Sequence, residues 1–438
     1  MFRVLILSAV VLVGAAPVAA AADLPAEPAI PAHLTLREAV NIFRTHGLDL
    51  LIAEANAQAA AGDVTAANAI PNPNAAAGWY HFFFKDGAFA THDGWFVGLG
   101  DSNALEDTLS GKRGLRRGVA EAALAAARLQ RADAQRTLEL QVKQAYFAAA
   151  ASRVALDFSH EVATATARTF DLNQVRYKSG AISEVDLSRT ETAKLEAEQA
   201  ADAAAQSLHA AKVQLAFLLG RRQAFSDFQI DADQLRFAVP PALEGSSAQR
   251  LVDQAFETRP DLRAQENQRL RAQRSISLAQ RQRFPDLGVG VEYQQQGTSS
   301  QGSLAVSPPT LQVSLTGIIP LFYQQQGEIK KAEADSRAQD AQAAKLRAQI
   351  AADVENAYSA WLTARQLVQR MEGRLLERAA RASQLVELQY QKGAASLIEY
   401  LDAQRTYVST KGEYIQDLAT YWNAIFQIEA ATGTELVQ

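Results

Sequence analysis

The chain has 438 residues, a formal net charge of −5, 48% hydrophobic residues and no cysteine. This mild negative charge offers no basic surface for nucleic acid, so nucleic acid is excluded as a partner. The lack of cysteine excludes disulfide scaffolds, thiolate metal sites, cysteine catalysis and a lipid-accepting cysteine near the N-terminus. No Ser/His/Asp set or carboxylate pair stands out, so the sequence predicts no enzyme and no cofactor. The histidines show no metal-ligand spacing: His33, His46, His81, His92, His160 and His209.

Residues 1–22 have the pattern of a cleaved secretory signal peptide. Arg3 supplies the positive start, 4–13 form an apolar core, and small residues precede Asp23. No later apolar run reaches the ~18 residues of a transmembrane helix. We therefore expect an exported chain that, if it spans a membrane, does so with strands.

Beyond the leader, the residues from 34 to 69 have a helical pattern that Pro71 and Pro73 close. The stretch 119–219 then contains no proline and only one glycine, Gly180, near its middle. Such a stretch predicts two long antiparallel helices joined by a tight turn. At 1.5 Å per residue, the first of these helices, about 60 residues from 119 to 179, would extend roughly 90 Å, which excludes an ordinary compact domain.

An internal duplication relates the two halves of the chain. Tyr177, Gly180 and Asp186 match Tyr390, Gly393 and Glu399, in each case 213 residues further on. We therefore divide the chain into a first repeat, 23–220, a connector, 221–247, and a second repeat, 248–438. Each repeat is expected to contain a helix, a strand pair (about 75–101 and 286–317) and a long hairpin (119–219 and 328–432).

The predicted strand pairs alternate between apolar and polar residues. In the second repeat, Leu287, Val289, Val291 and Tyr293 alternate with glycine and polar residues. This pattern fits either transmembrane strands or a soluble hairpin with an aromatic core. Four strands cannot close a membrane barrel, for which ~8 is the usual minimum. A membrane role would therefore require a homo-oligomer whose chains share one barrel.

A seven-residue repeat marks the second hairpin. Val354, Trp361, Val368 and Leu375 follow this spacing, and Ala357, Ala364 and Met371 lie three residues after the first three. In the first hairpin, Leu140, Phe147 and Val154 repeat in the same way. Apolar residues at this period predict the buried seam of a supercoiled helix pair.

These features together resemble the TolC-like outer-membrane efflux factor family. The resemblance covers the whole mature chain and rests on the two copies, their strand pairs and the motifs around Gly180 and Gly393. The segment Gly317-Ile-Ile-Pro-Leu-Phe322, together with Gly111-Lys112-Arg113, is most similar to the cobalt-zinc-cadmium (heavy-metal) branch.

The resemblance implies a homotrimer in the cell outer membrane, in contact with outer-membrane lipid. Three chains would form a 12-stranded transmembrane β-barrel and a periplasmic α-barrel. This duct would passively conduct cargo, expected to be heavy-metal cations, from an inner-membrane resistance-nodulation-division pump through a periplasmic adaptor. Organic-compound efflux or type I protein secretion remains an alternative cargo assignment. A soluble periplasmic coiled-coil scaffold or adaptor is the alternative from a different class.

The resemblance also implies which residues work at the hairpin tips. Tyr390, Glu399 and Asp402 would line the periplasmic aperture, with Asp186 as an acidic partner. Adaptor docking is expected at Tyr177, Gly180, Ala181, Gly393 and Ala394. Ala395 stands where exporters of the family carry arginine. Crowded carboxylates would favour cations. Alternatively, the acids are solvated residues at helix starts, and the tyrosines pack as caps on the turns.

Overall fold

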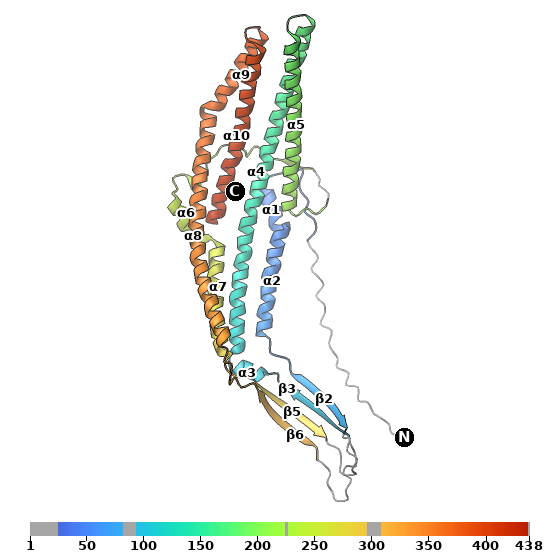
Figure 1. The fold of residues 1–438 in the computed structure, drawn as a ribbon, viewed down its shortest axis with the longest axis vertical. Helices are drawn as coiled ribbons and strands as arrows, with labels where there is room; N and C mark the ends of the chain where they lie inside the picture. Colours follow the sequence, from blue (N-terminus) through green and yellow to red (C-terminus); the bar gives the residue numbers. More distant parts are fainter. Residues whose placement is uncertain (1–24, 82–92, 224–226, 296–307, 437–438) are drawn as a thin grey trace, which may run out of the picture.

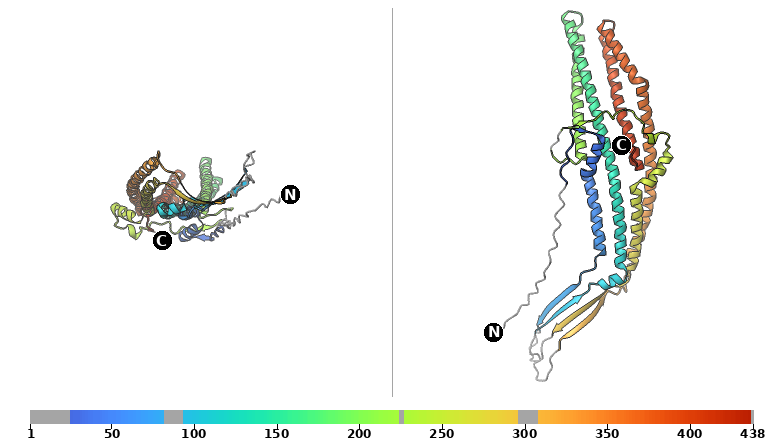
Figure 2. Two further views of the ribbon diagram at one scale, coloured as in Figure 1. Left: turned by 90° about the horizontal axis from the view of Figure 1, so that it is seen from below. Right: turned by 180° about the vertical axis from the view of Figure 1, so that it is seen from behind.

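The computed structural model describes residues 25–81, 93–223, 227–295 and 308–436, and the predicted signal segment lies outside them. The molecule is elongated, with a small sheet at one end and two helical tips at the other (Figure 1). Seen along its length, it forms a curved layer of helices (Figure 2). The predicted class, mainly helical with a small strand part and two tandem repeats, is confirmed.

The first repeat begins with two helices that differ from the single helix predicted over 34–69. The helix is interrupted at Gly47, where an added Cβ would lie 2.5 Å from the Phe43 ring. The long helix α4 begins at Lys112, earlier than the predicted 119, despite Gly114 and Gly118, because it packs along α2 and α7. The elements are α1 (Leu36–His46), α2 (Leu48–Asn68), β2 (Asn74–His81), β3 (Asp93–Gly100), α3 (Ala104–Leu109), α4 (Lys112–Lys178) and α5 (Glu184–Leu218).

The second repeat follows the same order after a connector that crosses the middle of the molecule (Figure 1). In the connector, β4 (Gln229–Ile230) pairs in parallel with β1 (His33–Leu34), and a short 3-10 helix spans Pro241–Leu243. The later elements are α6 (Ala248–Thr258), α7 (Pro260–Arg281), β5 (Leu287–Gln295), β6 (Thr310–Gly317), α8 (Gln326–Arg370), a π-helical turn (Met371–Leu375), α9 (Leu376–Gln391) and α10 (Leu397–Thr432).

The two strand pairs join in one antiparallel sheet of order β2-β3-β5-β6. Opposed residues share a face, so the register separates two chemically different surfaces. On one face Leu99, Val291 and Val313 align across three strands. On the other, Gly98, Glu292 and Gln312 align in the same way. The sheet therefore has an apolar face and a polar, glycine-rich face.

The main core lies at the level of the connector. Its largest fully buried side chains come from α1, α4, α8 and α10: Phe43, Tyr146, Phe147, Trp361, Tyr421 and Phe426. Tyr421 donates a hydrogen bond to the Ala238 carbonyl (2.9 Å), and Trp422 donates to that of Arg236 (3.1 Å). These two hydrogen bonds hold the connector against α10, so the two repeats share one core.

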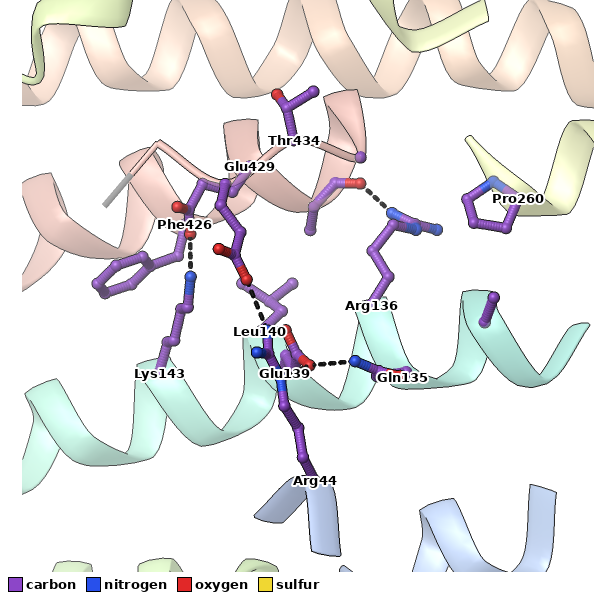
Figure 3. A pocket seen from close by; sticks show the side chains of 14 residues that line it. Arg44, Gln135, Arg136, Glu139, Leu140, Lys143, Pro260, Phe426, Glu429 and Thr434 are labelled. Atoms are coloured by element: carbon purple, nitrogen blue, oxygen red, sulfur yellow. Dashed lines mark hydrogen bonds and ion pairs between the residues drawn. The ribbon is translucent and has the colours of Figure 1, made fainter. Parts of the chain in front are cut away.

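A charged pocket borders this core between α1, α4 and α10 (Figure 3). Lys143 and Glu429 form a buried ion pair of 2.7 Å. Arg44 donates hydrogen bonds to both carboxylate oxygens of Glu139, at 2.7 and 3.1 Å. Arg44 also reaches Glu435 near the C-terminus at 2.6 Å. Buried charges need such partners, so this pocket serves to fix the three helices relative to one another.

The predicted heptad seam is buried from Val354 to Met371 and then ends. Trp361 and Val368 are almost fully buried, whereas Leu375 is 50% exposed. The reason is the π-helical turn Met371–Leu375, which adds a residue to one turn and rotates the following helix. The prediction for Leu375 was therefore wrong. In the first hairpin, Phe147 is buried and Leu140 and Val154 are partly buried against the same core.

No helix within the described ranges is long and apolar enough to cross a membrane.

Candidate functional site at the helical tips

The two hairpin turns have the same backbone geometry. Gly180 (φ +74°) and Gly393 (φ +77°) adopt the left-handed conformation, which glycine enters at little cost. After each glycine, the next amide donates back into the preceding helix, from Ala181 to the Arg176 carbonyl (2.8 Å) and from Ala394 to that of Gln389 (2.8 Å). This is the Schellman arrangement. Both glycines and both alanines are exposed.

A serine then starts each returning helix. Ser183 caps α5 by accepting from the Asp186 amide (3.2 Å), and its hydroxyl donates to the Asp186 carboxylate (2.9 Å). Ser396 caps α10 in the same way, and the Glu399 carboxylate accepts from both the amide (2.7 Å) and hydroxyl (2.9 Å) of Ser396. The acidic positions that the duplication matches, Asp186 and Glu399, therefore take part in the caps of their helices.

The cap at the start of α10 affects the ionisation of Glu399. The Ser396 amide, and then its hydroxyl, stabilise the carboxylate and lower the pKa of Glu399 below its usual value. Asp186 is half-buried and has Arg189 within 3.7 Å. Glu399 is exposed. Both acids are helix-start residues, which is the alternative role that the sequence offered for them.

Asp402 lies one turn further along α10, in a groove between the two hairpin tips. Residues of both α5 and α10 line this groove. It combines acids (Glu184 and Asp402), arginines (Arg189 and Arg405) and the exposed apolar side chains of Val185 and Ile398. A surface with these three components can bind a helical partner through apolar contact flanked by ion pairs.

Tyr390 is buried between the hairpins, with only 6% of the residue exposed. Its ring stacks on Tyr400 at 5.2 Å, and its hydroxyl donates to the Asn173 carboxamide oxygen at 2.7 Å. The guanidinium of Arg176 lies 5.2 Å from the ring centre and donates to the Gln391 carbonyl. In the single chain, Tyr390 thus joins α9 to α4, and its predicted role at the aperture stays a prediction.

Two further positions near the turns differ in their surroundings. Tyr177 is 39% exposed, and Ala395 packs against the cluster formed by Tyr390, Leu397 and Tyr400. Sequence reasoning missed Asn173 and Arg176, which hold Tyr390 from the first hairpin. Neither residue has a periodic or motif signal, because the contact joins positions more than 200 residues apart.

Among the residues described, no group of three or more His, Asp or Glu side chains could hold a metal ion. The candidate site is therefore a set of surfaces and caps at the end of a long helical wall. At the opposite end of the molecule, the sheet has one apolar and one polar face.

Comparison with known proteins identifies the family. The sequence profile described as outer membrane efflux protein matches residues 90–221 and 251–434. The chain belongs to this family of efflux channels, which are not enzymes. The predicted membership of the TolC-like family is thereby confirmed. A search of curated protein sequences finds no match.

Solved structures share the fold at low sequence identity. The channel protein CusC is 18% identical with a TM-score of 0.75, covering 91% of this chain and 92% of its own. The CmeC outer membrane channel of Campylobacter jejuni is 15% identical (TM-score 0.74; 92% and 87%). The MtrE outer membrane channel of Neisseria gonorrhoeae, in its open state, is 18% identical (TM-score 0.71; 92% and 89%).

Proposed function

We propose that this protein is the outer-membrane exit duct of a tripartite efflux system. Three chains would join their four-stranded sheets into one closed sheet of twelve strands, and their helices into one periplasmic tube. The observation that carries the proposal is the register of the sheet, which aligns Leu99, Val291 and Val313 on one face and Gly98, Glu292 and Gln312 on the other. Such a sheet suits lipid outside and water inside.

Membrane extraction and conductance test this duct. We expect the protein in the outer-membrane fraction, released only by detergent, as an oligomer that dissociates on heating. In planar bilayers the purified oligomer should form ion-conducting channels. Recovery in the soluble periplasmic fraction would instead support the scaffold or adaptor alternative.

The groove between the tips supports a docking role for the periplasmic adaptor, which would connect the duct to an inner-membrane resistance-nodulation-division pump. Val185 and Ile398 would supply apolar contact, and Arg189 and Arg405 would pair with acids of the adaptor. Replacing Val185 and Ile398 with serine should abolish cross-linking to the adaptor. The matched control replaces Leu195 with serine. Leu195 is an exposed residue of α5 that lies farther from the tip, and its replacement should leave cross-linking unchanged.

Heavy-metal cations are the proposed cargo. Glu399 and Asp402 are exposed on the start of α10, so a trimer would bring up to six carboxylates to the aperture, which Asp186 and Tyr390 would also line. Replacing Glu399 and Asp402 with alanine should reduce the preference of single channels for cations over anions. The matched control replaces Glu333 and Asp335, exposed acids near the sheet end of α8. Equal selectivity in both variants would refute the acidic aperture.

A further inference from the structure

An apolar segment projects from the molecule where the sheet meets the helices. In the β6–α8 connection, Phe322 is 99% exposed, and Ile318, Ile319 and Leu321 are 70–83% exposed. Phe284, in the neighbouring α7–β5 connection, is also exposed. We call these five side chains the ledge. Large apolar side chains held this far out of a core mark an interaction surface.

The ledge is held in place by polar contacts on both sides. Arg283 donates to the Gln324 carboxamide oxygen (3.3 Å), which joins the two connections. The Tyr323 hydroxyl donates to Glu328 (2.6 Å) and accepts from the Gly327 amide (3.0 Å), which fixes the entry into α8. Phe322 therefore projects from a braced turn.

Two observations indicate what covers the ledge. It directly follows β6, whose Leu311, Val313 and Leu315 are each about 70% exposed on the apolar face of the sheet. Exposed arginines border it, and the Arg281 guanidinium lies 5.2 Å from the centre of the Phe284 ring. Aromatic side chains beside cations at the end of an apolar span are typical of the membrane–water interface.

The geometry points to the ledge as an interfacial anchor that inserts into the periplasmic leaflet of the outer membrane, with Arg281 and Arg283 binding the phosphates of anionic phospholipids. This inference rests on the proposed membrane duct. The apolar side chains would lie at the boundary between headgroups and acyl chains, and the arginines would remain at the phosphates because their charge favours water. The anchor would fix the depth of the sheet in the bilayer without a lipidated cysteine, which this chain does not contain.

Site-directed spin labelling can test the anchor, because the chain has no native cysteine to interfere. Phe322→Cys would be labelled and the protein reconstituted in vesicles of phosphatidylethanolamine and phosphatidylglycerol. Collision of the label with oxygen, which concentrates in lipid, is compared with collision with a water-soluble nickel chelate. Val313→Cys on the sheet and Val185→Cys at the tip are the lipid and water references.

We expect the ratio of oxygen to chelate accessibility at position 322 to be several-fold higher than at 185. A ratio equal to that at 185 would overturn the anchor, as would shielding from both reagents, which would mean that a second copy of this chain covers the ledge. In either case, a high ratio of oxygen to chelate accessibility at position 313 would leave the proposed duct standing. A ratio at 313 as low as that at 185 would refute the duct itself.

The arginines are tested separately with Arg281→Gln combined with Arg283→Gln in the Phe322→Cys chain. Adding phosphatidylglycerol to the vesicles should place the label deeper in the bilayer in the Phe322→Cys protein that keeps both arginines. It should not change the depth of the label in the protein that lacks them. An equal increase in both proteins would overturn the headgroup role of the arginines.

Discussion

The Tyr390 hydroxyl donates to the Asn173 carboxamide at 2.7 Å, and both residues are buried between the two hairpins. This bond joins α9 of the second repeat to α4 of the first, close to the tips. The stacked Tyr400 ring extends the contact, since its hydroxyl lies 3.1 Å from Thr169 of α4. The two tips of one chain are therefore fastened to each other by hydroxyl groups.

Tyr390→Phe should loosen this contact. The ring would still stack on Tyr400, but the buried Asn173 would lose a donor, at a cost of about 1–3 kcal/mol. Hydrogen exchange should become faster in the last turns of α4 and α9. Tyr177→Phe, at the exposed matching position, is the control and should leave exchange unchanged. Equal exchange in both variants would mean that the bond contributes nothing to the junction.

Gly180→Ala and Gly393→Ala should each destabilise their turn by about 1–2 kcal/mol, because an L-residue is strained at positive φ. Neither added Cβ would meet an atom within 4 Å, so strain is the sole cost. Gly412→Ala makes the same chemical change within α10, also in open space, and should stabilise by roughly 0.5–1 kcal/mol. Thermal unfolding followed by circular dichroism would show whether the effects have these opposite signs.

Lys112→Met should weaken the junction between sheet and helices. The buried ammonium of Lys112 contacts Asp286 (2.6 Å), the Phe284 carbonyl (2.8 Å) and Glu106 (3.2 Å). Removing one member of a buried ion pair costs about 3–5 kcal/mol. The yield of heat-dissociable oligomer should therefore fall.

Arg117→Met, which breaks an exposed pair with Glu121, is the control for Lys112 and should cost about 0–1 kcal/mol. Equal yields from the two variants would show that the Lys112 contacts do not hold the junction.

The start of α10 should lose stability in acid. The pKa of Glu399 is lowered in the folded chain from an ordinary value of 4.5, because the carboxylate accepts from Ser396. A lowered folded pKa stabilises the fold above the unfolded value, and this contribution is lost as the pH falls through the folded pKa. Protection of the first turn of α10, corrected for intrinsic exchange rates, should therefore decline below about pH 4.5.

Glu399→Gln keeps a side-chain acceptor for Ser396 but cannot titrate, so in this variant the protection should not depend on pH over the same range. A parallel decline in both proteins would assign the effect to another group.

Much of the fold could be predicted from the sequence because the signals are local. The alternation from Leu287 to Tyr293 and the lone Gly180 in a proline-free stretch each depend on residues a few positions apart. The duplication then set the order of elements in both halves. The helix boundary at Lys112 was missed because Gly114 and Gly118 weaken the local helical signal, and packing against α7 offsets that weakness.

The sequence alone determined the repeat, the hairpins, the two-faced strands and the family, because periodicity and turn chemistry are properties of neighbouring residues. Only the tertiary structure decided which side chains meet. It placed Tyr390 against Asn173, and it exposed Leu375 through a π-helical turn that no heptad count reveals. These outcomes depend on how two distant hairpins pack, and a change of one residue per turn alters which face of a helix is buried.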